Sequence, residues 1–391
     1  MRFIRSTTVL AVIVLVFGCA LPGAAWQLGG GARKQGNPPD GKEASGLYIG
    51  TLGPQQVVLE IRQGGAAFAG RYFYSRIGKA IPLKGTRLPS GEFRAREMPG
   101  GKANGAEWLL ATSGNDASGY FCKCDVRAPA APGAKAPLSI TMARAAKGLT
   151  YKDLLLDFPL KLDPEVQVSN EVAWVMQTDT RFKASMPRLT RFPDKKIMEK
   201  VNADLDAKLK ESRLHSAVQF QGDAPEEGEW NEEIKVGLVS RDVLSLRIVD
   251  FYSVPDTAYP DASVSTRIYD LHTGGEFDFE KFFIKSEELP KVKVEDPEDA
   301  AEAPGERLNN RLAALYLKHY GKPPEGCEDK EDEILNGAGN PHLYFEKEGL
   351  SVEYELAHAI RGCGEARIIP YRELEPLVRK DGRMHYLTDQ Q

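Results

Sequence analysis

Short apolar runs separated by glycines recur through the first third of the chain, starting near Tyr48. They follow one another at intervals of about ten residues, which is typical of an antiparallel meander that curls into a sandwich or a barrel. The runs are 57–61, 71–74, 80–83, 108–110, 119–122 and 138–142. In the second of them, Tyr72 and Tyr74 face one side of the strand and Phe73 faces the other. We therefore expect one aromatic side in the core and the other side half exposed.

A different pattern begins near Leu149. Apolar residues recur every four positions from Ile197 to Leu209, which predicts an amphipathic helix with Asp194 as its N-cap. A second helix is predicted from about Glu306 to Tyr320, where a glycine and two prolines follow. Strands are predicted at 234–239, 243–252, 264–271, 343–345, 350–356 and 366–369, and a short helix ends at 374. Because strands and helices come in blocks and not in strict alternation, the class is α+β with an antiparallel sheet.

These patterns divide the chain into four predicted parts. Residues 1–25 are a signal peptide, and residues 26–45, rich in glycine and proline without periodicity, are a flexible tether. Residues 46–147 are an all-β meander, either a sandwich or a barrel. Residues 148–391 are an α+β domain with an antiparallel sheet and two main helices.

The N-terminus predicts export. Arg2 and Arg5 precede the uncharged stretch Ser6–Ala25, which has an apolar centre and ends in small residues, as secretory signals do. Signal peptidase would cut after Ala25, whereas a lipoprotein peptidase would cut before Cys19, in a sequence that resembles a bacterial lipobox. An uncleaved signal anchor is the third alternative. In all three cases the folded body lies outside the cytoplasm, in the periplasm or the cell envelope, so nucleic acids and nucleotide cofactors are not expected partners.

Charge is distributed unevenly along the 391 residues. Residues 45–147 carry 14 basic and 6 acidic side chains (net +8), whereas residues 148–391 carry 32 basic and 48 acidic ones (net −16). A basic module is therefore joined to an acidic one, although the formal net charge is only −5. A basic face favours anionic partners such as teichoic acids or lipid headgroups, and an acidic one attracts basic proteins; the alternative is that the charge only aids solubility.

Five cysteines fit an oxidising compartment. We expect Cys327 to pair with Cys363, because both have glycine neighbours and both lie in the acidic part of the chain. Cys122 and Cys124 would then face the same side of one strand. They could form a second disulfide, hold a soft metal or remain as free thiols; no further ligand lies nearby in the sequence, which favours a structural role.

Residues 165–380 resemble a known family of domains. The ordered motifs are Arg267–Gly274 (RIYDLHTG), Phe277–Phe283 (FDFEKFF), Gly349–Val352 (GLSV) and Ile369–Leu374 (IPYREL), preceded by Met186–Leu189 (MPRL) and Val201–Leu205 (VNADL). They are similar to the domain of unknown function in the exported part of lysozyme-sensing anti-sigma factors, and to a domain that precedes the catalytic part of a peptidoglycan deacetylase. The resemblance implies a tight turn at Asp270, Thr273 and Gly274, in which the aspartate caps backbone donors and the glycine takes a positive φ.

The chain departs from this family in two respects. Many relatives have Gly-Ala-His before the turn, where this chain has Thr257–Pro260 (TAYP), so a role for that imidazole is in doubt. Metal-dependent deacetylases also need two histidines at helical spacing, and the six histidines here are never closer than 16 residues. The resemblance therefore implies an exported recognition or accessory domain without a catalytic partner.

Motifs of known enzyme classes are absent from the sequence. There is no Gly-x-Ser-x-Gly, no His-Glu-x-x-His, no P-loop and no Gly-x-Gly-x-x-Gly opening a helix. The best polar candidates are His358 with Glu355, His272 beside Asp270, and the acidic run Glu325–Glu333. For each of them a structural role is favoured over catalysis. We therefore assign no catalytic, cofactor-binding or metal-binding residues.

The resulting prediction is an exported, non-catalytic binding protein of the bacterial cell envelope that recognises a cell-wall glycan or a protein such as lysozyme. It would touch the membrane only through an N-terminal lipid or anchor. A lipoprotein scaffold is a structural alternative. An envelope hydrolase with a non-local site is the enzymatic one, and it predicts a concave pocket in which His358 or His272 meets a carboxylate within hydrogen-bond reach.

Overall fold

The structure is a computed structural model that describes residues 45–123, 136–219, 229–253, 261–290, 307–321, 326–327, 341–356 and 363–379. Residues Asp40–Gln391 form one compact unit, and Met1–Pro39 belong to another. The predicted signal peptide, Cys19 and residues 26–44 of the predicted tether lie outside the described residues. Because Asp40–Gln391 are a single unit, the division of this part into a basic and an acidic domain stays a prediction.

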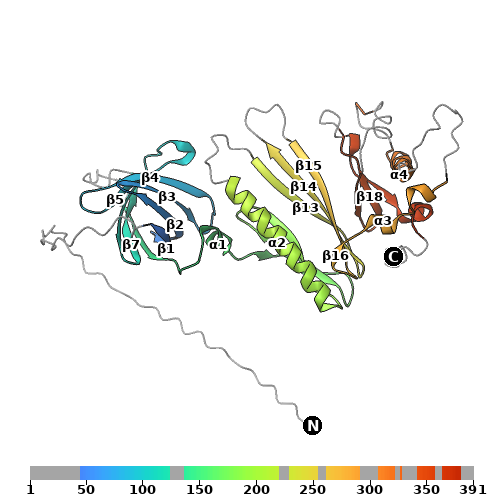
Figure 1. Cartoon of the computed structure of the whole chain (residues 1–391), viewed down its shortest axis with the longest axis horizontal. Helices are drawn as coiled ribbons and strands as arrows, with labels where there is room; N and C mark the ends of the chain where they lie inside the picture. The colour runs from blue at the N-terminus through green and yellow to red at the C-terminus, as the bar shows by residue number, and fades with distance from the viewer. Residues whose placement is uncertain are drawn as a thin grey trace, which may run out of the picture. The chain divides into compact units, whose positions relative to one another are not determined.

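The first described part is a closed antiparallel barrel in which each strand pairs with its neighbours in the sequence and the last strand pairs with the first (Figure 1). The strands are β1 (Gly46–Leu52), β2 (Gln55–Gly64), β3 (Ala67–Tyr74), β4 (Ala80–Arg87), β5 (Phe93–Glu97), β6 (Glu107–Ser113), β7 (Asp116–Cys122) and β8 (Leu138–Arg144), with a 3-10 turn η1 (Pro99–Gly101). The meander predicted from the sequence is thus confirmed, and of the two predicted forms it is the barrel.

Side chains fill the interior of the barrel. Alternate residues point inward; in β2 these include Val57, Leu59 and Ile61, all at most 1% exposed. The rings of Tyr72 and Trp108 pack inside with their centroids 4.6 Å apart. Val58, on the outer face of β2, is also buried, at 3% exposure, so residues on both faces of this strand belong to a core.

The outer face of β2 and β3 is covered by a helix that the sequence analysis did not predict. Helix α1 (Tyr151–Leu156) places Tyr151 edge-on against Phe73, with 5.0 Å between the ring centroids. Phe73 is fully buried and Tyr72 is 1% exposed. The Phe73 side is therefore core, because α1 seals it; on the other side Tyr74 stays partly exposed, so the expectation of a partly exposed aromatic side holds only at Tyr74.

The remaining described residues form three antiparallel sheets and a few helices, which confirms the predicted α+β class. The first sheet contains β9 (Lys161–Leu162), β10 (Val166–Gln167), β11 (Ala173–Asp179) and β12 (Ala184–Arg191). The second contains β13 (Glu229–Val239), β14 (Val243–Ser253), β15 (Asp261–Asp270) and β16 (Gly275–Glu276). The third contains β17 (His342–Phe345), β18 (Gly349–Glu353) and β19 (Arg367–Pro370).

Two helices are long, as predicted. They are α2 (Lys195–Gln219) and α4 (Arg307–Lys318); the short ones are α3 (Phe279–Phe282), η2 (Ser286–Glu288), α6 (Tyr371–Leu374) and η6 (Glu375–Leu377). Asp194 caps α2, because its Oδ1 accepts hydrogen bonds from Lys196 N at 2.8 Å and Ile197 N at 3.2 Å. The stripe Val201, Leu205 and Leu209 is buried in one core with residues of β12, β14 and β15. In the described ranges, no helix is long and apolar enough to cross a membrane.

A separate core lies between α4 and the third sheet. It contains the disulfide Cys327–Cys363, with 5.5 Å between the Cα atoms, which confirms this predicted pair. The hydroxyl of Tyr320 donates to the carbonyl of Cys363 at 2.7 Å, so one end of the bridge is also held by α4 and its extension. Cys122 is disulfide-bonded as well, but Cys124 lies outside the described residues, and the Cys122–Cys124 pair stays a prediction.

Candidate functional site

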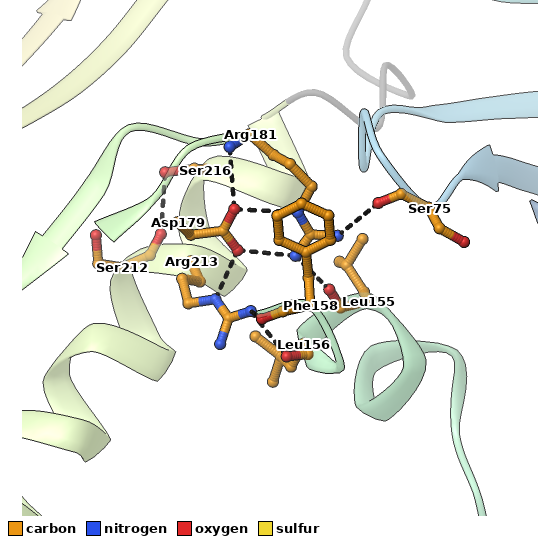
Figure 2. Close-up of polar contacts among 9 residues, drawn as sticks. All are labelled: Ser75, Leu155, Leu156, Phe158, Asp179, Arg181, Ser212, Arg213 and Ser216. Atoms are coloured by element: carbon orange, nitrogen blue, oxygen red, sulfur yellow. Dashed lines mark hydrogen bonds and ion pairs between the residues drawn. The ribbon is translucent and has the colours of Figure 1, made fainter. Parts of the chain in front are cut away.

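Two groups of charged side chains could mark a functional site, and the first is sealed inside the protein (Figure 2). Asp179, at the end of β11, accepts hydrogen bonds from the guanidinium groups of Arg181 and Arg213. Arg181 Nη2 and Arg213 Nε each lie 2.8 Å from Asp179 Oδ2. The side chains of Asp179 and Arg181 are 0% and 1% exposed. Solvent and ligands therefore have no access to this group.

The sealed ion group is also saturated with partners (Figure 2). Arg181 donates to the carbonyls of Ser75 at 3.2 Å and Leu155 at 2.6 Å, so it bonds the β3–β4 turn of the barrel and the end of α1 at once. Arg213 donates to Leu156 O at 2.7 Å. Burial alone would raise the pKa of Asp179, but the hydrogen bonds and charge of Arg181 and the charge of Arg213 outweigh it and lower the pKa. The group fastens elements together and is structural.

The second group lines an open cleft of about 400 Å³ at the N-terminus of α2. The lining residues come from the start of α2, the β13–β14 turn and the β15–β16 turn: Phe192, Pro193, Asp194, Ile197, Arg241, Asp242, Leu271 and His272. Half of these side chains are apolar and half are polar or charged. This cleft is the candidate functional site.

A histidine–aspartate pair lies in the cleft. Nε2 of His272 is 2.5 Å from Oδ1 of Asp242. The Asp242 side chain is only 8% exposed, whereas that of His272 is 46% exposed and remains accessible from the cleft. The carboxylate therefore fixes the orientation of an imidazole that a ligand could still reach.

The β13–β14 turn positions the carboxylate of this pair. Ser240 is fully buried, and its Oγ accepts hydrogen bonds from the backbone N–H groups of Asp242 at 3.0 Å and Val243 at 3.1 Å. The carbonyl of Asp242 in turn accepts from Leu271 N at 2.8 Å. The two turns that form the pair are thus bonded to each other through the backbone.

The β15–β16 turn positions the imidazole. Asp270 accepts from the N–H of His272 through its Oδ1 at 2.9 Å, and from Gly274 N through its carbonyl at 2.7 Å. Gly274 has a φ of 63°, a value that glycine adopts readily. This is the tight turn expected at Asp270, Thr273 and Gly274, and its location at the cleft was not expected.

Helix α2 holds the same turn from the other side. Nζ of Lys200 donates to Thr273 O at 2.9 Å. A Cβ atom on Gly274 would lie 3.1 Å from Cδ of Lys200 and 3.5 Å from Cγ2 of Ile197, so the turn packs closely on the first turns of the helix. The distance between His272 and the start of α2 is therefore set by direct contacts.

Of the other candidates from the sequence, only Glu355 can be placed. His358 and most of the acidic run Glu325–Glu333 lie outside the described residues. Glu355 lies 3.4 Å from Nε2 of His342, in the third sheet. Within the described ranges, no three His, Cys, Asp or Glu side chains are grouped in a way that could hold a metal ion.

Sequence reasoning missed Asp242, Arg241 and Phe192. The sequence contained a signal for Asp242 and Arg241. The polar residues 240–242 separate the predicted strands 234–239 and 243–252, and the third predicted strand, 264–271, ends at the 270–274 turn. In an antiparallel meander the first and third of three successive turns lie at the same end of the sheet. Applied here, that rule would have placed Asp242 beside His272.

The chemistry of the cleft suits a ligand with both apolar and hydroxyl-bearing surfaces. Phe192 and Leu271 offer apolar contact, and Asp194, Arg241 and His272 offer hydrogen bonds. Nη1 of Arg241 lies 3.5 Å from Glu171 with both side chains more than half exposed, so the guanidinium can exchange that contact for a ligand.

No family model matches the chain, and no curated protein matches it. Solved structures of proteins from the DUF3298 family are similar to part of it. One is from Bacteroides fragilis NCTC 9343, with 14% sequence identity and a TM-score of 0.37, covering 59% of this chain and 98% of that chain. Another is from Pseudomonas aeruginosa PAO1, with 13% identity and a TM-score of 0.32, covering 57% of this chain and 97% of that chain. Neither protein's name states a ligand, a partner or a reaction, and the resemblance to anti-sigma and deacetylase domains stays a prediction.

Proposed function

We propose that the chain is an exported, non-catalytic binding protein of the bacterial cell envelope, and that the cleft at the N-terminus of α2 binds a cell-wall glycan. The observation that carries the proposal is the accessible imidazole of His272, held by Asp242 in a cleft whose lining is half apolar. A cleft of about 400 Å³ is within the usual range of small-ligand sites.

The lining supports a glycan because of the shape of a sugar ring. A pyranose presents C–H groups on its faces and hydroxyls around its edge. Phe192 can contact the faces, while the carboxylate of Asp194 and the guanidinium of Arg241 can bind the hydroxyls, or the acidic group of an anionic sugar in the case of Arg241. A pocket with a few fixed polar groups on an apolar wall is the usual form of such a site.

Two further features support export and binding. The Cys327–Cys363 disulfide suits an oxidising compartment. The resemblance of residues 165–380 to the exported domain of lysozyme-sensing anti-sigma factors, and to the accessory domain of a peptidoglycan deacetylase, also points to recognition at the cell wall.

The experiment is a calorimetric titration of the chain with soluble disaccharide-peptide fragments of peptidoglycan. We expect binding that His272→Ala weakens about tenfold, the equivalent of one lost hydrogen bond to a fixed side chain. His342→Ala is the matched control, because His342 also meets a carboxylate but lies outside the cleft. Equal affinities of the two variants, or no binding by the wild type at millimolar concentrations, would contradict the proposal.

A hydrolase is the second candidate, and the geometry of His272 and Asp242 is the observation that favours it. A general base oriented by a carboxylate within hydrogen-bond reach is one condition of an acid–base site. None of the eight lining residues carries a hydroxyl or a thiol, so the nucleophile would be water or one of the lining carboxylates, Asp194 or Asp242. Release of soluble products from purified peptidoglycan by the wild type and not by His272→Gln would establish this function instead.

A basic protein such as lysozyme is the alternative partner. Residues 148–391 carry a net charge of −16, which would attract such a protein at low ionic strength. Capture of lysozyme that is strong at low salt and weak at high salt would support it. If the immobilised chain captures no more lysozyme than an uncharged control bead does at either salt concentration, lysozyme is not a partner.

A further inference from the structure

A row of basic side chains crosses the outer wall of the barrel. Arg62 of β2 pairs with Ala69 of β3, Ala69 with Lys84 of β4, and Lys84 with Arg96 of β5. All four residues are exposed. Directly paired residues share one face of a sheet, so the three cations lie side by side on the outside, and the row spans three strand spacings, about 14 Å.

The acidic side chains of this wall lie beneath arginines. Glu60 accepts from Arg71 Nε at 2.7 Å and from Arg62 Nη2 at 3.2 Å. Its side chain is 22% exposed, whereas that of Arg62 is 69% exposed.

The same arrangement recurs four strands away, on β6. Glu107, 7% exposed, lies within 2.8 Å of both Arg94 and Arg96. Each carboxylate therefore pairs with two guanidinium groups that are more exposed than it is, so the solvent-exposed charge of this wall is positive.

We propose that this basic row, Arg62, Lys84 and Arg96 with the flanking Arg71 and Arg94, is a docking surface for a membrane that contains anionic phospholipids. The row lies on the outer, convex wall of a closed barrel, and its flexible Lys and Arg side chains can extend from that wall to a charged surface. No aromatic residue interrupts the row, so it lacks the stacking positions that single-stranded nucleic acids require.

The position of the barrel in the chain favours a membrane over a soluble polymer. The first strand of the barrel begins at Gly46, downstream of the apolar segment Ser6–Ala25. With a lipid on Cys19 or an uncleaved anchor, the chain that precedes Gly46 would tether the barrel to a bilayer. One weak anchor combined with a basic patch is a common way to hold a protein at a membrane.

The charge of the rest of the chain would orient the protein. Residues 45–147 carry +8 and would be attracted to an anionic bilayer, whereas residues 148–391 carry −16 and would be repelled. The barrel would therefore face the lipid and the acidic part would face away. This inference concerns the barrel wall and does not depend on the cleft near His272.

The experiment is co-sedimentation of residues 26–391, which contain the whole compact unit, with vesicles of phosphatidylcholine alone or with one third phosphatidylglycerol. We expect binding to the anionic vesicles only, decreasing as salt rises. The triple variant Arg62→Gln, Lys84→Gln, Arg96→Gln should bind on the order of 100-fold more weakly, because each basic residue near the surface contributes about fivefold.

Two controls make the result specific. The variant Lys161→Gln, Lys281→Gln, Lys347→Gln changes the net charge by the same amount at exposed positions outside the barrel, and it should bind as the wild type does. The double variant Arg62→Lys, Arg96→Lys keeps the charge of the row and should also bind. Equal weakening by the two triple variants would overturn the proposal, as would wild-type binding to soluble polyphosphate and not to anionic vesicles.

Discussion

Arg213 of α2 is bonded to Asp179 at the end of β11 through a contact of 2.8 Å between Nε and Oδ2 (Figure 2). Asp179 also holds Arg181, which donates to the barrel residue Ser75 and to the end of α1. A single carboxylate therefore organises the site where four elements meet. Because two guanidinium groups depend on it, its loss should affect the whole unit and not one element.

Asp179→Asn should destabilise the protein by about 3–5 kcal/mol, measured as the free energy of unfolding in urea. Removing one partner of a buried ion pair leaves charge without compensation, and here two buried arginines lose their counter-ion. Asp206→Asn is the control, because Asp206 pairs with Arg188 at an exposed position and should cost at most about 1 kcal/mol. A similar loss of unfolding free energy in the two variants would show that the buried ion group contributes no more to stability than an exposed ion pair does.

The stability contributed by Asp179 should depend on pH. Its pKa is lowered in the folded state, so the contribution is fully present above the pKa of the unfolded chain, about 3.9, and is lost as the pH falls through the folded pKa. The difference in unfolding free energy between the wild type and Asp179→Asn should therefore be largest near pH 6 and shrink below pH 4. Urea titrations at pH 6, 4 and 3 measure it, and a difference that does not change with pH would contradict the assignment.

The sequence was sufficient for features that depend on local pattern. Short apolar runs separated by glycines and other turn residues identified most strands, and the four-residue stripe ending at Leu209 identified α2 with its Asp194 cap. Helix α1 was missed because its six residues are too few to show a helical period. The burial of Phe73 could not be assigned from the sequence for the same reason, since Tyr151, which packs on it, belongs to that helix.

The candidate site was harder to predict because its parts are far apart in the sequence. The turn at Asp270–Gly274 was found through its motif, but a motif does not say which residue faces it. Asp242 lies 30 residues away from His272, and the two meet only because β14 and β15 are antiparallel neighbours. The ion group around Asp179 had no signal of its own, because a charged residue at a strand end is usually solvent-exposed.

The Cys327–Cys363 disulfide should stabilise the C-terminal core. The two cysteines are 36 residues apart, and closing a loop of that length contributes about 3–4 kcal/mol through the unfolded chain. The double variant Cys327→Ala, Cys363→Ala should unfold at correspondingly lower urea concentration, with exchange-protected amides lost first in α4 and β19. The double substitution is preferable to a reducing agent, because Cys122 is also disulfide-bonded. Unchanged stability would show that the bridge does not constrain the unfolded chain.

Gly274→Ala should disturb the candidate site more than an equivalent change elsewhere. Gly274 and Gly321 have similar positive φ values, 63° and 69°, so alanine at either position costs about 1–2 kcal/mol in backbone strain. At Gly321 nothing lies within 4 Å of an added Cβ, whereas at Gly274 the Cβ would press on Lys200 and Ile197 of α2. We therefore expect chemical-shift changes in the His272 ring for Gly274→Ala and none for Gly321→Ala, with a larger loss of stability in the former. Equal losses and an unmoved His272 signal in both variants would mean that α2 does not hold this turn in place.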